Sequence, residues 1–321
     1  MSKRFKVLLT NPIHPLYHEE LSKECDVIVS PDIKPDTLKG LISGCDGLIV
    51  RCQLPDDIFD NAAHLKAVVR HGVGLDFIPV AAATKKGIPV ANLPGSNTTA
   101  VVEYCLAAIF YFRRRLDLID SALRSQGWAK ARPMADPSTE LSTTTLGIIG
   151  MGAIGSKLAK AASALQMNVI ALTRRPETLP SNITAATKEE LFAQSDVVAI
   201  CCPLNDQTRG LVDRASISLM KPNAILINIA RGPVIDTQAI LDALVAEKIA
   251  GAAMDVHDQQ PLSGDEAVFD CPNLLLTPHI ASMTATSMRG MSKGSVETIK
   301  AILNGVKVEN VVNPEVFLNK A

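Results

Sequence analysis

The sequence predicts an α/β protein with two parallel sheets, because short apolar runs rich in valine and isoleucine alternate with segments of helical spacing. Stretches such as VVAICC and AILINIA are apolar on both faces, which is typical of central strands that helices cover on both sides. The predicted strands form two sets: 6–10, 26–29, 47–50, 67–70 and 88–92, then 145–149, 168–173, 197–202, 224–229, 250–256 and 273–277.

Helical segments connect these strands and divide the chain. Three of them lie within the first set: 16–24, 36–43 and 77–87. A long amphipathic segment, 98–126, separates the two sets, and we expect Asn97 to cap its amino end. The proline-rich stretch 131–139 is expected to be a loop. The final helical segment, 284–304, follows the second set, and in a two-domain protein it would return the chain to the first domain.

The composition excludes several classes of protein. The 321 residues carry a formal net charge of −1, unlike the basic surface of a nucleic-acid-binding domain. The apolar runs are too short to cross a bilayer, and the amino terminus does not have the apolar core of a signal peptide. Seven cysteines show no CxxC pair and no zinc-ligand spacing. We therefore expect reduced thiols, no metal site and a cytoplasmic protein that binds neither nucleic acid nor membrane.

A glycine-rich turn lies between a predicted strand and a predicted helix, in LGIIGMGAIGSKLAK. Gly150, Gly152 and Gly155 form the spacing GxGxxG directly after the strand at 145–149. The first glycine permits a tight turn, the second lets the backbone approach a pyrophosphate, and the third lets the helix pack closely on the strand. The N–H groups and the dipole of the helix amino terminus then attract the anion. The motif in this context predicts a dinucleotide-binding site.

The residues after the next strand indicate which dinucleotide binds. An acidic residue about 20 positions beyond the glycines usually binds the ribose 2′-hydroxyl of NAD, but no Asp or Glu occurs between Gly155 and Glu177. Thr173, Arg174 and Arg175 stand there instead. Two guanidinium groups and a hydroxyl group suit a 2′-phosphate through charge-assisted hydrogen bonds. We therefore predict NADP(H) as the preferred cofactor and NAD(H) as the alternative.

Seven blocks of the sequence resemble the D-isomer-specific 2-hydroxyacid dehydrogenases, in the order of that family and along nearly the whole chain. The blocks are VVRHGVGLD (68–76), NLPGSNTTAVVEY (92–104), GIIGMGAIG (147–155), PLNDQTRGLVD (203–213), INIARGPVID (227–236), AAMDVHDQQP (252–261) and TPHIAS (277–282). The resemblance implies two doubly wound parallel sheets: a Rossmann cofactor domain, 98–283, inserted into a flavodoxin-like substrate domain, 1–97 with 284–321. It also implies a homodimer built on the cofactor domain, in which the segment 98–126 takes part.

The same resemblance assigns three residues to the reacting carbon. Arg231, beyond the carboxyl end of a predicted strand, would grip a substrate carboxylate and polarise the 2-oxo group. His279 would donate a proton to the oxygen in reduction and accept one in oxidation. Gln260 departs from the family, which usually has glutamate there, so it can orient the imidazole but supplies no charge. The spacing leaves Asp258 and Asp265 open as substitutes for the missing carboxylate.

The resemblance implies further contacts in both domains. Backbone N–H groups of Val73 and Gly74 would bind the substrate carboxylate, because glycine permits close approach. Arg51 and Asn97 fall at substrate-facing positions, although a solvated arginine and a helix-capping asparagine are equally open interpretations. The cofactor contacts are Asp255, as acceptor for the nicotinamide carboxamide, with Ala153, Ile154, Pro203, Thr208 and Ala230.

Together these features predict an oxidoreductase that transfers hydride from NADPH to a small 2-oxo acid such as glyoxylate or hydroxypyruvate. D-3-phosphoglycerate dehydrogenase is the alternative, since Arg51, Arg70 and His71 leave a phosphorylated substrate open. Formate dehydrogenases also resemble this family and place glutamine beside histidine, but their longer amino-terminal portion argues against that activity. A protein that senses NAD(H) without turnover is the alternative of another class, and Arg231 and His279 argue against it.

Overall fold

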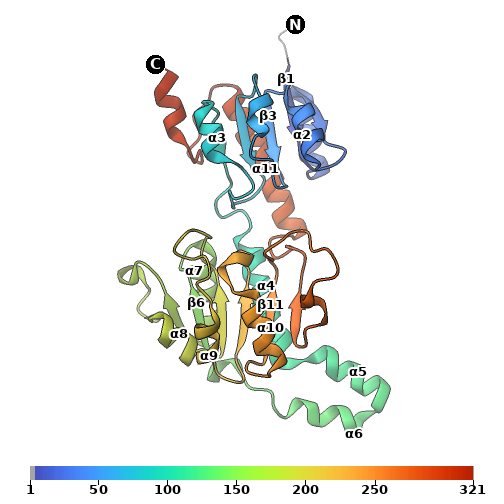
Figure 1. Ribbon diagram of the computed structural model, residues 1–321, viewed down its shortest axis with the longest axis vertical. Helices are drawn as coiled ribbons and strands as arrows, with labels where there is room; N and C mark the ends of the chain where they lie inside the picture. Colours follow the sequence, from blue (N-terminus) through green and yellow to red (C-terminus); the bar gives the residue numbers. More distant parts are fainter. Residues whose placement is uncertain (1–3, 321) are drawn as a thin grey trace. The chain divides into compact units, whose positions relative to one another are not determined.

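The computed structural model describes residues 4–320 and divides the chain into two compact units, which are shown in Figure 1. The first unit contains the residues up to Asn97 and those from Met283 onward, and the second unit is Thr98–Ser282. The predicted second boundary was one residue later, at 283. Each unit is built on a parallel sheet with helices on its faces, which confirms the predicted fold class.

The first unit contains a five-stranded sheet in the order β2-β1-β3-β4-β5. β1 lies between β2 and β3, with Val7 opposite both Val27 and Gly47. This is the strand order of flavodoxin-like domains, in which the order reverses between the first and third strands. The strands are β1 (Phe5–Leu9), β2 (Cys25–Val29), β3 (Gly47–Val50), β4 (Ala67–Arg70) and β5 (Val90–Ala91).

Helices bury an apolar cluster against each face of this sheet. The final helix, α11, packs on β3 so closely that a methyl group at Gly47 would lie 3.2 Å from Ile299 and 3.3 Å from Leu303. The end of the chain therefore completes the core of the first unit. The helices are α1 (Pro15–Glu24), α2 (Pro35–Ile42), α3 (Val80–Lys85) and α11 (Ala285–Leu303), with 3₁₀ turns η1 (Ile58–Asn61) and η7 (Pro314–Lys320).

The second unit contains a seven-stranded sheet in the order β12-β11-β10-β9-β6-β7-β8. Its first strand, β6, lies between β7 and β9, so the strand order reverses there as in a Rossmann domain. β8 is a two-residue edge strand that the sequence pattern did not predict. The strands are β6 (Thr145–Ile149), β7 (Asn168–Leu172), β8 (Thr184–Ala185), β9 (Val197–Ile200), β10 (Ile225–Asn228), β11 (Gly251–Met254) and β12 (Leu274–Leu276).

The segment 98–126 forms two helices, although the sequence predicted one. Arg115 has a φ of 43°, in the left-handed region, and this residue separates α4 (Thr98–Arg114) from α5 (Leu116–Gln126). The predicted cap is also wrong, because Asn97 Oδ1 is buried and accepts no hydrogen bond from residues 4–320. The helix break has no signal in the sequence, since no glycine or proline marks position 115.

The stretch 131–139 is not wholly a loop. The short helix α6 (Trp128–Ala131) and the 3₁₀ turn η2 (Arg132–Ala135) continue from α5, and α5 and α6 extend from the second sheet as an arm (Figure 1). No helix among residues 4–320 has the length and apolar composition needed to cross a membrane. The other elements of this unit are α7 (Ala153–Ala164), α8 (Lys188–Gln194), α9 (Arg214–Leu219), α10 (Thr237–Val245), η3 (Leu141–Thr143), η4 (Pro176–Thr178), η5 (Gly232–Val234) and η6 (Ala267–Asp270).

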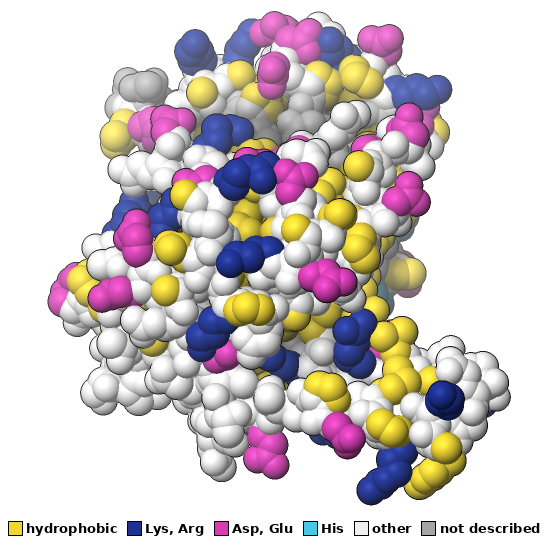
Figure 2. Space-filling view, turned by 60° about the horizontal axis from the view of Figure 1, so that its bottom comes forward, with side chains coloured by type: hydrophobic (Ala, Val, Ile, Leu, Met, Phe, Trp, Pro, Cys, Tyr) yellow, Lys and Arg dark blue, Asp and Glu magenta, His cyan; other side chains and the backbone are white. Residues whose placement is uncertain are grey.

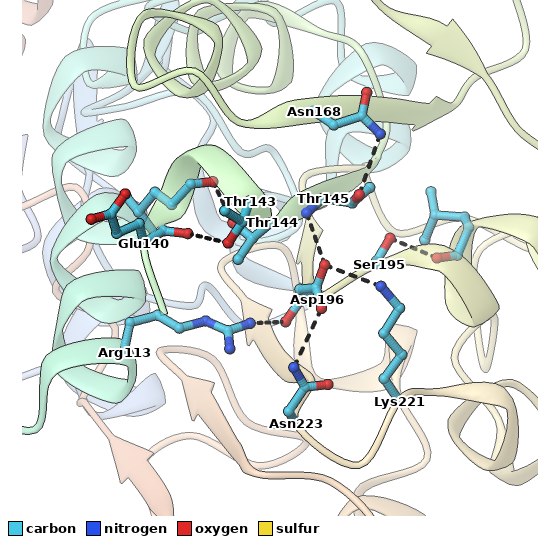
Figure 3. A network of polar contacts seen from close by, with 12 residues as sticks. Arg113, Glu140, Thr143, Thr144, Thr145, Asn168, Ser195, Asp196, Lys221 and Asn223 are labelled. Atoms are coloured by element: carbon cyan, nitrogen blue, oxygen red, sulfur yellow. Dashed lines mark hydrogen bonds and ion pairs between the residues drawn. The ribbon is translucent and has the colours of Figure 1, made fainter. Parts of the chain in front are cut away.

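A polar network joins the amino ends of the central strands of the second sheet (Figure 3). Asp196 precedes β9, and its side chain is only 10% exposed. Its carboxylate accepts hydrogen bonds from Thr145 N (2.9 Å), Lys221 Nζ (3.1 Å) and Asn223 Nδ2 (3.4 Å). Arg113, at the end of α4, donates to the carbonyl oxygen of Asp196 (2.6 Å). The network compensates the buried negative charge of Asp196 and fixes the amino ends of these strands relative to one another. The strands therefore hold the residues at their carboxyl ends in fixed positions.

Candidate active site

The glycine turn after β6 is crowded on its inner side and open on its outer side. Gly150 has a φ of 97°, where a side chain is strained, and a Cβ there would lie 2.8 Å from the Cα of Cys202. A Cβ on Gly155 would overlap the carbonyl oxygen of Gly150, so only glycine lets α7 pack this closely on the turn. In contrast, no described atom lies within 4 Å of the Cβ position of Gly152. Backbone is therefore accessible to a ligand at Gly152.

Helix α7 begins directly after this open position. Gly152 is its N-cap and makes no side-chain capping bond. The first intrahelical bond runs from Ser156 N to Gly152 O (2.9 Å), so the N–H groups of Ala153, Ile154 and Gly155 precede it and have no partner within the helix. These groups and the helix dipole attract an anion. The residues present thus fit the pyrophosphate of a dinucleotide.

Two arginines follow β7, the strand next to β6. Thr173 Oγ1 accepts a hydrogen bond from Arg175 N (3.2 Å), which turns the chain at the end of the strand. Arg174 and Arg175 are exposed, and neither guanidinium forms an ion pair with the described part of the chain. The strand end therefore presents two positive charges where the sequence predicted the 2′-phosphate contact.

The carboxyl ends of three adjacent strands bring the candidate catalytic residues to one edge of the second sheet. β10, β11 and β12 are parallel neighbours, with Asn228 opposite Met254 and Met254 opposite Leu276. Arg231 follows Asn228 by three positions, and His279 follows Leu276 by three positions. The glycine turn follows the carboxyl end of β6 in the same sheet. Arg231, His279 and the dinucleotide turn therefore belong to the same edge, where ligands bind in open α/β sheets.

His279 and Gln260 form a hydrogen-bonded pair, with 2.9 Å between His279 Nδ1 and Gln260 Oε1. Gln260 Nε2 donates to the carbonyl oxygen of His257 (3.3 Å), which assigns the amide orientation and turns Oε1 toward the imidazole. Because an amide oxygen only accepts, Nδ1 of His279 carries a hydrogen. Proton transfer to a substrate then falls to Nε2, and the contact at Nδ1 is the pairing that the sequence predicted.

The two carboxylates that the spacing left open as substitutes have other partners. Asp258 accepts a hydrogen bond from Thr237 Oγ1 (2.7 Å). Asp265 accepts one from the hydroxyl of Ser263, two residues away in its own loop. Neither carboxylate takes the place of the family's glutamate beside the imidazole, where Gln260 lies.

Backbone contacts hold Arg231 beside the segment that leads to Gln260. The fully buried Asn228 donates from Nδ2 to Arg231 O (3.0 Å) and accepts at Oδ1 from Ala230 N (3.0 Å). A Cβ on Gly232 would overlap the backbone of His257, so glycine at this position permits the close approach of the two segments. The approach brings Arg231 next to the chain that carries Gln260.

The loop after β9 is closed by the hydroxyl group of Thr208. It donates to Pro203 O (2.7 Å) and accepts from Asn205 N (2.8 Å). The resemblance implied that Pro203 and Thr208 contact the cofactor. Both residues lie in the loop that follows the carboxyl end of β9, next to β6, where the strand order reverses. The hydroxyl group of Thr208 stabilises the conformation of that loop.

Asp255 makes internal bonds that the sequence motif did not predict. Its carboxylate is 1% exposed and accepts hydrogen bonds from Thr277 Oγ1 (2.6 Å), Ile280 N (2.7 Å) and Ala281 N (2.8 Å). The expected contact with a nicotinamide carboxamide remains a prediction. The hydrogen bonds that Asp255 makes in the structure are with the chain around His279. The only sequence feature that pointed to them was an acidic residue directly after the buried run AGAAM.

In the first unit, the loop after β4 is held by its carbonyl groups. Asn92 Nδ2 donates to Val73 O (2.7 Å), and Arg70 Nε donates to Gly74 O (3.0 Å). No acceptor among residues 4–320 takes the N–H groups of Val73 and Gly74. Successive free N–H groups of this kind form an anion-binding site. The predicted binding of a substrate carboxylate by these two N–H groups remains a prediction, and nothing in the sequence indicated that Arg70 and Asn92 hold the carbonyl groups of this loop.

Two basic residues near this loop are occupied by internal contacts. The Arg70 guanidinium lies over the ring of Phe77, 4.6 Å from its centroid. His71 is buried, and its Nε2 lies 2.9 Å from Ser292 Oγ. Burial, with the positive charges of Arg51 and Arg70 nearby, lowers the pKa of His71 to about 3. His71 is therefore uncharged at neutral pH.

The other two predicted substrate residues also lie in the first unit. Arg51 donates a hydrogen bond to Pro12 O, and burial lowers the pKa of its guanidinium. Asn97 presents a buried Oδ1 that no described residue donates to. Their roles toward a substrate remain predictions.

Comparison with known proteins places these features in a family context. Residues 106–281 match the family model described as D-isomer specific 2-hydroxyacid dehydrogenase, NAD binding domain. A glyoxylate reductase from Aeropyrum pernix is 35% identical over 98% of this chain and 97% of that protein. A D-3-phosphoglycerate dehydrogenase from Methanocaldococcus jannaschii is 33% identical over 96% of this chain but only 59% of that protein. The solved NADPH-dependent glyoxylate/hydroxypyruvate reductase from Sinorhizobium meliloti, in complex with NADP and malonate, is 27% identical with a TM-score of 0.85 over 97% of each chain.

Proposed function

Because this chain belongs to the D-isomer specific 2-hydroxyacid dehydrogenase family, we propose that it reduces a small 2-oxo acid, such as glyoxylate or hydroxypyruvate, with NADPH. Its membership makes it an NAD(P)-dependent oxidoreductase that acts on the CH–OH group of 2-hydroxy acids. The observation that supports the specific reaction is the His279–Gln260 pair at the sheet edge that also carries Arg231 and the glycine turn.

The residues of this chain divide the work of reduction. When bound, NADPH supplies the hydride that reaches the carbonyl carbon. His279 donates the proton on Nε2 to the carbonyl oxygen, while the hydrogen on Nδ1 stays on that nitrogen and keeps its hydrogen bond to Gln260 Oε1. Arg231 polarises the oxygen through its guanidinium. The N–H groups of Val73 and Gly74 bind the substrate carboxylate.

Gln260→Glu should extend reduction to higher pH. A glutamate carboxylate beside the imidazole raises the pKa of His279, because a nearby negative charge stabilises the protonated ring. Reduction needs the protonated ring, so its alkaline limit should move up by about one pH unit or more. The measurement is kcat/KM against pH for both proteins. Gln194→Glu, on the exposed side of α8, is the matched control. If the alkaline limit of Gln260→Glu does not move, the side chain at position 260 does not influence the proton transfer by His279.

We propose that NADPH is preferred because Arg174 and Arg175 bind its 2′-phosphate. Arg174→Ala should then lower kcat/KM for NADPH by about 10- to 100-fold, the value of a lost hydrogen bond between charged groups. NADH has no 2′-phosphate, so its kcat/KM should change little. Lys160→Ala, which removes an exposed charge from α7, controls for net charge. Equal losses with both cofactors would contradict the assignment.

We propose an unphosphorylated substrate rather than D-3-phosphoglycerate. A phosphate needs several accessible cations, whereas Arg70 is bound to its own loop and His71 is neutral. The test is a panel of glyoxylate, hydroxypyruvate and 3-phosphohydroxypyruvate with NADPH and NADH at two pH values. Faster turnover of the phosphorylated compound would favour the phosphoglycerate dehydrogenase reaction. Cofactor binding without turnover of any compound would favour the sensing protein.

We propose that the arm of α5 and α6 joins two copies of this chain in a homodimer. Figure 2 shows hydrophobic side chains gathered on the arm, where Leu116 and Trp128 are 65% and 69% exposed. Exposed apolar patches of this kind mark interfaces. Leu116→Lys should shift the sedimentation coefficient from dimer to monomer, whereas Leu219→Lys, on α9, should not. A monomeric parent protein would rule the dimer out.

A further inference from the structure

The turn that carries His279 has a backbone conformation that needs support. His279 has a φ of 57°, in the left-handed region, which is strained for a residue with a side chain. Its N–H donates to the carbonyl oxygens of Asp255 (2.9 Å) and Thr277 (3.0 Å). The direction of the imidazole thus depends on how firmly these two residues are held.

Thr277 connects several parts of the second unit to this turn. Its hydroxyl donates to Asp255 Oδ1 (2.6 Å) and lies 2.7 Å from the hydroxyl of Tyr104, on α4. Its carbonyl oxygen accepts from His257 Nε2 (3.1 Å) as well as from His279 N. Every polar group of the Thr277 side chain and carbonyl is therefore occupied by a residue near the turn.

The direction of the hydrogen bonds follows from chemistry. A threonine hydroxyl has one hydrogen, and that hydrogen goes to Asp255, so Tyr104 must donate to Thr277 Oγ1. Burial, together with the negative charge of Asp255, raises the pKa of Tyr104 to about 12. The phenol therefore keeps its hydrogen at any working pH. The result is a one-way chain of donors from Tyr104 through Thr277 to Asp255.

We infer that Tyr104 and Thr277 are positioning residues for proton transfer by His279, acting through the carboxylate of Asp255. The Asp255 carboxylate also accepts hydrogen bonds from Ile280 N and Ala281 N, so it holds the backbone immediately after the histidine. The chain of bonds links helix α4 to the turn and holds the left-handed residue in place. This inference rests on the proposed role of His279 as the proton donor.

The test is a set of variants that keep shape and remove hydroxyl groups. Tyr104→Phe should lower kcat by about 2- to 10-fold, the value of one neutral hydrogen bond, with the Kd for NADPH unchanged. Thr277→Val should lower kcat further, and Thr277→Ser, which restores the hydroxyl, should recover most of it. Tyr17→Phe, on α1 of the first unit, is the matched control. Wild-type kcat in Tyr104→Phe, or no recovery in Thr277→Ser, would overturn the inference.

Two double variants separate positioning from general stability. If Tyr104 acts through Thr277, Tyr104→Phe should cause no further loss in Thr277→Val. If both act through His279, Tyr104→Phe should also cause no further loss of residual rate in His279→Asn. Multiplying losses in either double variant would overturn the inference. Full activity of His279→Asn alone would overturn the role of His279 as proton donor, whereas a parent protein that turns over no 2-oxo acid would overturn the proposed function, so these failures are distinguishable.

Discussion

Replacement of His279 by asparagine is expected to lower kcat for 2-oxo acid reduction by about 10²- to 10⁴-fold, the usual contribution of positioned proton transfer. Asparagine is the appropriate substitute because the residue has a φ of 57°, and asparagine tolerates the left-handed region better than other residues with side chains. The variant therefore removes the imidazole with little strain in the turn.

Initial rates across pH measure this effect. In the parent protein, reduction should weaken as pH rises and the imidazole loses its proton, and this limb should be absent from the His279→Asn profile. The Kd for NADPH should be unchanged, because the glycine turn lies at the carboxyl end of a different strand. His64→Asn, at an exposed position of the first unit, is the control. A His279→Asn enzyme within threefold of the parent would show that the proton comes from another group.

Arg231→Lys is expected to lower kcat/KM by about 10²- to 10³-fold, the loss seen when a donor that stabilises the developing oxyanion is removed. Lysine keeps the positive charge but not the planar fork that binds carboxylate and carbonyl oxygens together. The backbone at this position is held by Asn228 and by the close approach of Gly232 to His257, so the substitution should leave the fold intact.

Steady-state rates and thermal unfolding together test Arg231→Lys. The Tm of Arg231→Lys should stay near that of the parent. In a second variant, Arg231→Ala, which has no guanidinium group, added guanidine should restore part of the lost kcat/KM. Arg214→Lys, in an exposed ion pair with Asp242, is the control for an arginine whose contact is on the surface. Retention of parent kcat/KM by Arg231→Lys would mean that charge alone suffices and the fork has no role.

Local patterns predicted most of the elements because they depend on near neighbours in the sequence. Apolar runs such as VVAICC marked buried parallel strands, and Gly150, Gly152 and Gly155 marked the dinucleotide turn, since each requirement is met within a few residues. The predictions failed where no local signal exists. Arg115 ends a helix without a glycine or proline, and Asn97 Oδ1 is buried without the capping bond that its residue type suggested.

The sequence by itself determined the two parallel sheets, the family, and the candidate residues Arg231, Gln260 and His279. Only the tertiary structure decided which side chains touch: it paired His279 with Gln260 and joined Tyr104 to Thr277. The physical reason is that hydrogen bonds depend on distances of about 3 Å between residues far apart in the chain. Those distances arise only when parallel strands align in register and bring their carboxyl ends to one edge.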